Sequence, residues 1–296
     1  MDRLRTMETF VAVAEAESFA AAARELGVSA PSATRAIGAL EARLGVRLFV
    51  RTTRSVRLTE TGSLYLEECR RILGELTAAE EAVAGAFTRP AGHLRVTAST
   101  QFGRVYVVPI LTDFLDAYPA VTAEGLFVDR IVNLLDEGID VAVRIGELAD
   151  SGLIARRVGE VRRIVCASPE FLSRHGEPRT PAELAEARTI CALPVTPGAV
   201  WRFKGRTSVR VRSRLRVSTV QTAIEAVLTG WGITRLLSYQ VGPELAAGRL
   251  CRILRAYEPD PLPIHLVHPE GRRPAEKVRA FLDFAAERLR RTAHLG

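Results

Sequence analysis

The sequence predicts a multidomain protein in which an all-α-rich winged helix-turn-helix unit is followed by a linker helix and then by a two-lobed α/β domain. Three patterns lead to this fold class. Residues 19–58 contain two helix patterns separated by a glycine and followed by a basic, two-stranded pattern. Residues 59–87 form one long helix pattern with an apolar repeat of 3.5 residues. Residues 92–296 alternate strand and helix patterns, which favours a mostly parallel sheet with helices on its faces.

A first amphipathic helix is predicted near the N-terminus. Its apolar residues recur at helical spacing, and they are Leu4, Met7, Phe10, Val11 and Ala14. The stripe indicates that this helix packs behind the helices that follow it, so its predicted role is support.

Residues 19–45 have the pattern of a helix-turn-helix. A short helix ends at Gly27, because glycine tolerates the positive φ of a helix end. Ser29 is a good N-cap for the second helix. Pro31 is tolerated in the first turn of that helix, where its missing N–H would have no helical partner.

The second helix is predicted to bury one stripe and expose another before it ends at Gly45. The buried stripe consists of Ile37, Leu40 and Leu44. The exposed stripe carries Ser32, Thr34 and Arg35 in the first turns, where a recognition helix places the residues that read bases in the major groove.

Residues 46–58 are predicted to form a β-wing. Two short apolar runs flank a polar turn that contains Arg51 and Arg54, an arrangement that suits contact with phosphates. From Arg24 to Arg57 the chain has seven arginines and two acids, a local charge of about +5. A solvated basic face would have the same charge, but the ordered series of helix, glycine turn, capped helix and basic wing is much harder to obtain otherwise.

In these residues the sequence resembles the LysR-type transcriptional regulators. The matching motifs are Met7-x-x-Phe10, Ser18-Phe19-x-x-Ala22-Ala23-x-x-Leu26, Ser29-x-Pro31-Ser32-x-Thr34-Arg35-x-Ile37, Leu40-Glu41-x-x-Leu44-Gly45, Leu48-Phe49-x-Arg51 and Leu58-Thr59-x-x-Gly62. The resemblance implies a DNA-binding domain over residues 1–58, a dimerising linker helix and hinge over 59–91, and an effector-binding domain over 92–296. Double-stranded DNA is therefore an expected partner.

The expected DNA-binding residues lie in the second helix and in the wing. They are Ser29, Ala30, Pro31, Ser32, Thr34, Arg35, Arg51, Thr52 and Arg54. Ala30 departs from the family, which often has glutamine after the N-cap serine, a side chain able to make two hydrogen bonds to adenine. In this chain that base is either not read or is read by apolar contact with a thymine methyl.

The linker helix is predicted to start at Thr59 and to reach about residue 87. An apolar seam of period 3.5 predicts that it pairs with the same helix of a second subunit, in a homodimer or a homotetramer. The predicted seam consists of Leu66, Cys69, Leu73, Leu76 and Val83, and Glu80 interrupts it. The alternative is a single helix that packs on its own domain. Residues 88–92 contain Pro90 and Gly92 and mark a hinge.

Seven strands and seven helices are predicted after the hinge. The strands are residues 94–98, 121–128, 141–145, 163–167, 189–193, 233–237 and 262–268. The helices are residues 105–117, 131–138, 169–174, 181–187, 220–229, 239–247 and 277–291. Two such α/β lobes resemble a periplasmic-binding-protein-like effector domain. The family resemblance implies a first lobe of 92–161 plus 269–296 and a second lobe of 162–268.

A small-molecule effector is expected at the carboxyl ends of the strands, where open α/β sheets collect their ligands. The candidate residues at strand ends are Ser99, Thr100, Gln101, Arg144, Gly146, Ser218 and Thr219. Arg202 could add a positive charge and Phe203 an apolar wall. Thr234 and Arg235 lie in a segment that, in the family, approaches the cleft. Arginines and helix N-termini favour a small polar or anionic ligand. Ser99 and Ser218 have an alternative role as helix caps, and the two roles are compatible.

Other motifs carry less weight. Gly230-x-Gly232 lacks the third glycine of a dinucleotide loop, and His265-x-x-His268 on a strand places its side chains on opposite faces, which disfavours a metal site. From Arg202 to Arg216 the chain has seven basic residues and no acid, which indicates either an exposed strand or a second surface that contacts phosphates. With no nucleophile elbow, metal-ligand helix or phosphate loop, neither enzyme activity nor a cofactor is expected.

Composition restricts the classes of protein to which the chain can belong. A chain of 296 residues with 47% apolar and 25% charged residues is not disordered or fibrous. The net charge of +7 and the isoelectric point near 9.7 suit an anionic partner. Four widely spaced cysteines predict reduced thiols, and no apolar run approaches the ~20 residues that span a bilayer.

We therefore expect a cytoplasmic, sequence-specific DNA-binding regulator. The competing hypothesis is an α/β solute-binding or metabolic protein with an accessory basic helical domain.

Overall fold

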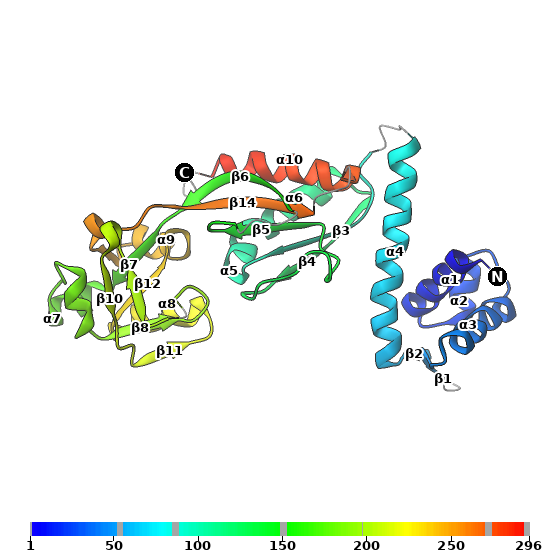
Figure 1. Cartoon of the computed structure of the whole chain (residues 1–296), viewed down its shortest axis with the longest axis horizontal. Coiled ribbons are helices and arrows are strands. Elements are labelled where there is room, and N and C mark those ends of the chain that lie inside the picture. Colours follow the sequence, from blue (N-terminus) through cyan, green and yellow to red (C-terminus); the bar gives the residue numbers. More distant parts are fainter. Residues whose placement is uncertain are drawn as a thin grey trace. The chain divides into compact units, whose positions relative to one another are not determined.

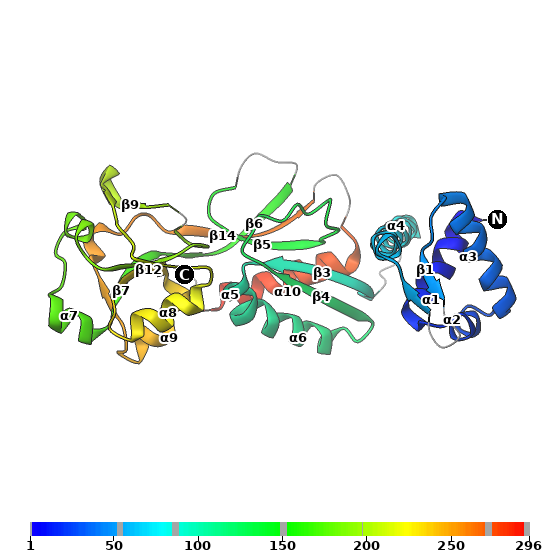
Figure 2. The same cartoon turned by 90° about the horizontal axis from the view of Figure 1, so that it is seen from below.

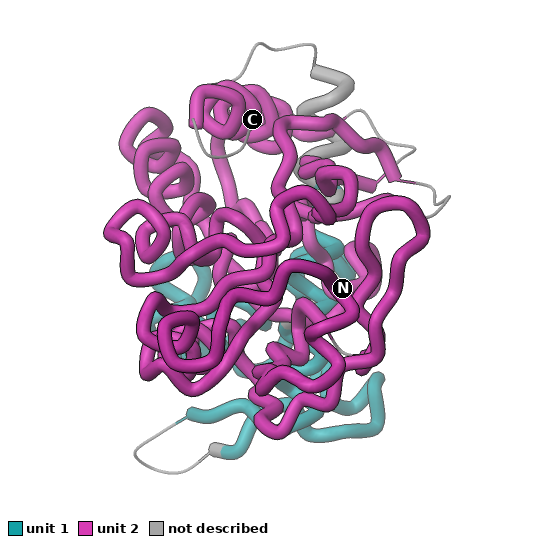
Figure 3. The backbone as a smooth tube through the Cα atoms, turned by 90° about the vertical axis from the view of Figure 1, so that its left-hand side faces the viewer, with its two compact units in different colours: residues 1–88 teal, residues 89–296 magenta. Residues whose placement is uncertain are grey.

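The computed structural model describes residues 2–51, 56–84, 89–148, 153–196, 198–269 and 274–292. At Arg51, Glu67, Glu75 and residues 77–84 it describes the backbone alone. The chain divides into two compact units, residues 1–88 and residues 89–296, which Figure 3 colours separately. The division falls in the predicted hinge.

The described residues of unit 1 form four helices and a two-stranded antiparallel sheet (Figure 1). These elements are α1 (Arg3–Ala16), α2 (Phe19–Glu25), α3 (Ala30–Leu44), β1 (Phe49–Arg51), β2 (Val56–Leu58) and α4 (Glu60–Ala84). The predicted helix boundaries are confirmed, since Gly27 and Gly45 have φ of 66° and 70° and the Ser29 hydroxyl accepts a hydrogen bond from Ser32 N at 3.3 Å. Thr59 caps α4 through Gly62 N at 2.9 Å.

The core of unit 1 lies between α1, α2, α3 and the start of α4. Phe10 is fully buried and its ring lies 5.2 Å from the rings of both Phe49 and Tyr65. Ile37 and Leu40 are buried as predicted, whereas Leu44 is 39% exposed. The prediction for Leu44 is wrong because α3 ends at this residue, and the buried stripe of α3 continues to Glu41 instead.

Two residues of the predicted subunit seam belong to this core. Leu66 and Cys69 are 9% and 0% exposed within a single chain, so the prediction that they pair with a second subunit is wrong. A heptad pattern does not say which partner a helix has, and here the first turns of α4 close the helix-turn-helix core. Leu73 and Leu76 are half-buried. The side chain of Val83 lies outside the described residues.

In unit 2, the part of the chain that the structure describes forms two five-stranded sheets and a small hairpin (Figures 1 and 2). The first sheet has the order β4-β3-β5-β14-β6, with β3 (Gly92–Ala98), β4 (Val121–Phe127), β5 (Val141–Ile145), β6 (Leu153–Val161) and β14 (Leu262–Pro269). The second has the order β11-β8-β12-β7-β13, with β7 (Arg163–Ala167), β8 (Thr189–Ala192), β11 (Leu215–Val217), β12 (Ile233–Leu237) and β13 (Cys251–Ile253). The hairpin pairs β9 (Val200–Arg202) with β10 (Ser208–Arg210).

Helices cover both sheets. They are α5 (Thr100–Phe102), the π-helical turn η1 (Gly103–Val107), α6 (Val108–Ala117), α7 (Pro169–His175), α8 (Val220–Leu228), α9 (Ser238–Ala246) and α10 (Glu276–Arg290), with 3₁₀ turns η2 (Pro181–Ala185), η3 (Lys204–Arg206) and η4 (Arg255–Tyr257). α6 and α10 pack on one face of the first sheet, where Phe114 and Phe281 meet at 5.2 Å (Figure 2). Among the described residues, no helix is long and apolar enough to cross a membrane.

Three expectations for unit 2 need correction. Residues 131–138 form turns and not a helix: Val132, Leu134 and Ile139 are buried without helical spacing, and Ile131 is 91% exposed. The strand at residues 262–268 pairs with β5 and β6, so it belongs to the first lobe and not to the second. Both sheets are mixed, because β14 in one sheet and β7 in the other run antiparallel to their neighbours.

Candidate functional site

The N-terminal turns of α3 present a polar face. Thr34 and Arg35 are exposed, as are Ser29 and Pro31, while Ala30 and Ser32 are half-buried. Local hydrogen bonds order this face: Arg35 Nη2 donates to Ser32 Oγ at 3.4 Å, and the hydroxyls of Ser29 and Ser32 lie 2.8 Å apart. The structure therefore brings together the six residues that the sequence placed on the recognition helix.

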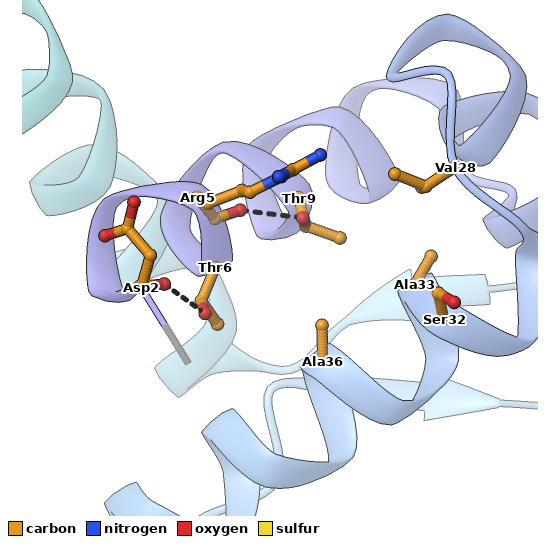
Figure 4. A pocket seen from close by; sticks show the side chains of 8 residues that line it. All are labelled: Asp2, Arg5, Thr6, Thr9, Val28, Ser32, Ala33 and Ala36. Carbon is orange, nitrogen blue, oxygen red and sulfur yellow. Dashed lines mark hydrogen bonds between the residues drawn. The ribbon is translucent and has the colours of Figure 1, made fainter.

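A hollow of about 200 Å³ lies beside this face, between α1 and α3 (Figure 4). Its lining residues are Asp2, Arg5, Thr6 and Thr9 from the start of α1, Val28 from the turn, and Ser32, Ala33 and Ala36 from α3. Arg5 is exposed, so α1 adds a positive charge next to the recognition helix. The sequence pattern predicted only a supporting role for α1 and did not point to Arg5.

A buried carboxylate connects α3 to the wing. Glu41 is 7% exposed, and its Oε1 accepts hydrogen bonds from Leu48 N at 2.8 Å and Phe49 N at 3.1 Å. The wing strand β1 is thereby fixed to the recognition helix. Motif matching pointed to Glu41 but gave it no role, because its partners are backbone groups seven and eight residues away.

The wing is the predicted antiparallel pair, with Arg51 opposite Val56. Of the wing residues expected to bind DNA, Thr52 and Arg54 lie outside the described residues, and Arg51 is described only in its backbone. Arg57 is described and exposed, and it pairs with Val50.

In unit 2 the two lobes meet where strands of both sheets end. Ser99 follows β3 of the first sheet, and Tyr239 lies just after β12 of the second. Burial raises the pKa of Tyr239 to about 12, and the Ser99 side chain has a smaller effect that lowers the same pKa. The Tyr239 ring packs on Phe102 and Tyr106, with centroids at 5.3 and 5.8 Å.

Polar groups surround this junction. Thr100 N donates to Asp129 Oδ1 at 3.0 Å, and Asp129 follows the end of β4. Gln240 Nε2 donates to the Tyr239 hydroxyl at 3.3 Å, while Gln240 Oε1 accepts from Leu237 N at 2.9 Å. Ser99 and Thr100 were predicted from the sequence, whereas Asp129, Tyr239 and Gln240 were not. The same rule, that ligands collect after strand carboxyl ends, would have found them.

Other predicted effector residues are placed near strand ends without a described contact to this junction. Gln101 is 8% exposed, and Gly146 follows β5. Ser218 and Thr219 are exposed and follow β11. Thr219 caps α8 by accepting a hydrogen bond from Thr222 N at 3.2 Å.

Thr234 and Arg235 are enclosed within the second lobe, so the prediction that they contact an effector is wrong. Thr234 is fully buried and donates to Ile190 O at 3.1 Å. Arg235 is 7% exposed, lies 5.1 Å above the Trp201 ring and donates to Arg202 O at 3.0 Å. Burial, with Arg163 nearby, lowers the pKa of Arg235 to about 10. Because β12 is covered on both faces, all of its side chains are enclosed.

Phe203 and Arg144 have structural roles as well. Phe203 is 6% exposed, lies in the core of the second lobe and contacts the Arg235 guanidinium. Arg202 is exposed on β9, in the hairpin that covers this core. Arg144 Nη2 donates to Val132 O at 2.8 Å, so it holds the turns at residues 131–138.

The four cysteines are free thiols, as predicted. Cys166 is enclosed in the second lobe, and burial raises the pKa of its thiol to about 12. A thiol with so high a pKa has very little of the reactive thiolate at neutral pH.

Comparison with known proteins covers both units. The family model described as "Bacterial regulatory helix-turn-helix protein, lysR family" matches residues 4–63, and the model described as "LysR substrate binding domain" matches residues 88–290. An HTH-type transcriptional regulator of Xanthomonas campestris pv. campestris is 36% identical over 288 residues, which cover 95% of this chain and 83% of that protein.

Solved structures agree over the whole chain. The structure of CrgA, a LysR-type transcriptional regulator from Neisseria meningitidis, matches with a TM-score of 0.62 and 31% identity over 98% of this chain and 99% of that one. The Vibrio cholerae virulence activator AphB matches with a TM-score of 0.61 and 28% identity over 97% and 99%. The chain belongs to the LysR family of helix-turn-helix transcriptional regulators, with an N-terminal DNA-binding domain and a C-terminal effector-binding domain.

Proposed function

We propose that α3 reads operator bases through Thr34 and Arg35, and that Arg51, Thr52 and Arg54 of the wing contact phosphates. The observation that carries the proposal is the exposed, capped N-terminal face of α3, on which Ser32 holds the Arg35 guanidinium. Arginine donates two parallel hydrogen bonds to guanine, the commonest base-specific contact in the major groove. The relatives are transcriptional regulators, and no catalytic role is proposed for any residue.

Replacing Arg35 by alanine should relax discrimination at one operator base pair. The expected cost is about 1–3 kcal/mol, which corresponds to roughly a 5- to 150-fold loss of preference for the native base pair. Binding to a set of single-base operator variants measures this loss. Arg43→Ala is the matched control, because Arg43 is exposed on the last turn of the same helix. Equal discrimination by the wild type and Arg35→Ala would remove Arg35 from base reading.

We further propose that the effector binds at the junction of Ser99, Thr100, Asp129 and Tyr239. Arg144 and Arg235, the two cations that favoured an anionic ligand, are engaged elsewhere, and Asp129 places a carboxylate at the junction. These contacts support a small polar effector recognised through hydrogen bonds to hydroxyl and carboxylate groups. A ligand there touches both lobes, so it can stabilise one arrangement of the lobes over another.

Tyr239→Phe should weaken effector binding about fivefold while leaving the fold intact, because it removes one hydrogen bond worth about 1 kcal/mol and keeps the ring. A thermal-shift screen of small polar metabolites on the wild type supplies the ligand, and calorimetry then compares the variants. Tyr257→Phe is the control, since Tyr257 packs in the core of the second lobe. A ligand that controls operator binding and binds Tyr239→Phe as tightly as the wild type would place the effector site elsewhere.

For assembly, we propose that α4 pairs between subunits through Leu73 and Leu76, and through Val83, in a homodimer or homotetramer. The half-burial of Leu73 and Leu76 within one chain supports this shorter seam. Since the partner is chromosomal DNA, we place the protein in the cytoplasm.

A further inference from the structure

A row of cations crosses the surface of the second lobe. We define the basic strip as Arg202, Lys204, Arg206, Arg210, Arg212, Arg214 and Arg216, all of which are exposed. No acidic residue occurs in the sequence between Glu186 and Glu225. The strip is therefore a local excess of positive charge.

The fold directs these side chains outward. Trp201 and Val209 face the core of the second lobe, so their neighbours on the β9–β10 hairpin, Arg202 and Arg210, lie on its outer face. Beyond the hairpin the alternation continues, with Val211 buried and Arg212 exposed. The inward residues hold the segment in place, and the cations contribute nothing to that packing.

The hairpin tip adds two cations that lie outside the strand ladder. Phe203 N donates to Thr207 O at 2.8 Å and closes a turn that contains Lys204, Gly205 and Arg206. Gly205 and Arg206 both have positive φ, 68° and 63°. The left-handed conformation of Arg206 is uncommon for a residue with a side chain, and the turn presents it to solvent beside Lys204.

Most of the strip lacks a neutralising partner. Elsewhere in unit 2 exposed arginines form ion pairs, such as Arg174 with Glu170 and Arg288 with Asp113. Within the described part of the chain, no acidic group pairs with any strip residue from Arg202 to Arg214. Unpaired like charges repel one another, so this arrangement costs stability unless an anion covers it.

Protection of a sheet edge explains only part of the strip. β11 is an edge strand of the second sheet, and charged residues such as Arg214 and Arg216 discourage pairing with other chains. Lys204 and Arg206 lie beyond any ladder, so edge protection gives no reason for them. Edge protection also does not require a single sign of charge.

We propose that the basic strip binds the phosphate backbone of double-stranded DNA, as a second DNA contact made by the effector-binding unit. The chain already binds this polyanion through unit 1, which raises the effective concentration of DNA around unit 2. Guanidinium groups match phosphate oxygens in geometry and charge. Contacts of this kind are independent of sequence and add affinity along DNA that flanks the operator.

The test uses the full chain and measures how operator affinity depends on salt. The strip variant carries four substitutions, Lys204→Gln, Arg206→Gln, Arg210→Gln and Arg212→Gln. The control variant removes the same charge from exposed sites elsewhere in unit 2, through Arg174→Gln, Arg249→Gln, Arg288→Gln and Arg291→Gln. Two duplexes serve as probes: one limited to the footprint of unit 1, and one extended on both sides. Both duplexes are taken from the DNA upstream of the gene for this protein, at the site that the wild-type protein protects in footprinting.

On the extended duplex the strip variant should show a shallower slope of log affinity against log salt, by about 0.9 for each lost phosphate contact and up to about 3.6 for four. On the short duplex the strip variant should match the control variant. Equal slopes for the two variants on the extended duplex overturn the proposal. The strip would then bind an acidic protein or only protect the sheet edge. If the quadruple variant unfolds, the double variant Lys204→Gln, Arg206→Gln at the unpacked tip repeats the test, with an expected change of up to about 1.8.

Discussion

Alanine at Gly62 should destabilise unit 1 by several kcal/mol, whereas alanine at Gly74 of the same helix should stabilise it. A Cβ at Gly62 would lie 2.1 Å from Leu48 O and 3.1 Å from Leu58 Cδ2. Leu48 O cannot retreat freely, because it accepts a hydrogen bond from Thr59 N at 2.9 Å. Overpacking commonly costs about 1–3 kcal/mol, and a clash with fixed backbone lies at the upper end of that range or beyond.

Gly74 supplies the matched control. Nothing lies within 4 Å of a Cβ built on Gly74, and alanine is a better helix former than glycine by about 0.5–1 kcal/mol. Urea unfolding followed by helical circular dichroism, together with operator binding, compares the two variants. If Gly62→Ala is as stable as Gly74→Ala, then the first turn of α4 does not pack on the wing as described.

Leucine at Glu41 should disconnect the wing from the recognition helix. It leaves the N–H groups of Leu48 and Phe49 without their acceptor in a site that is 7% exposed. An unsatisfied buried donor costs about 1–3 kcal/mol, so the two together are expected to cost roughly 2–6 kcal/mol. Operator affinity should fall with stability, because the wing loses its fixed position relative to α3.

Glu41→Gln separates this effect from a general loss of packing. Glutamine keeps an oxygen where Oε1 accepts both hydrogen bonds, so it should restore most of the stability that leucine loses. Urea unfolding measures the stability of each variant, and footprinting measures protection of the operator DNA that the wing contacts. Leucine and glutamine variants of equal stability would show that the Glu41 carboxylate does not hold the wing.

Local chemistry explains which parts of the fold the sequence predicted well. The cap at Ser29 and the glycines at 27 and 45 act within a few residues, and the structure confirms all three. Leu44 and the segment at 131–138 follow apolar spacing as closely as real helix faces do. The prediction for Leu44 failed because α3 ends at this residue. The prediction for residues 131–138 failed because packing against other segments decides their conformation, and a single sequence does not show that packing.

The candidate sites, too, were predicted well only where nearby residues determine the exposure of a side chain. Arg35 was predicted because a helix N-terminus specifies its own exposed face. Arg235 was misplaced because the β9–β10 hairpin, whose Trp201 covers its guanidinium, was not predicted. Tyr239 was missed because its significance depends on Ser99, which is 140 residues away in the chain and lies in the other sheet.

The pairing of β14 with β5 and β6 also determines the order in which the chain can fold during its synthesis. The second sheet consists of residues 163–253, whereas the first sheet needs both residues 92–161 and residues 262–269. The second lobe is thus complete on the ribosome before the first, although the first lobe begins earlier in the sequence. Until α10 emerges, Leu94, Val96 and Phe114 lack part of the surface that buries them in the finished protein. Translation that stops between residues 257 and 262 therefore yields a finished second lobe attached to an unfinished first one, a product that exposes apolar surface to chaperones and proteases.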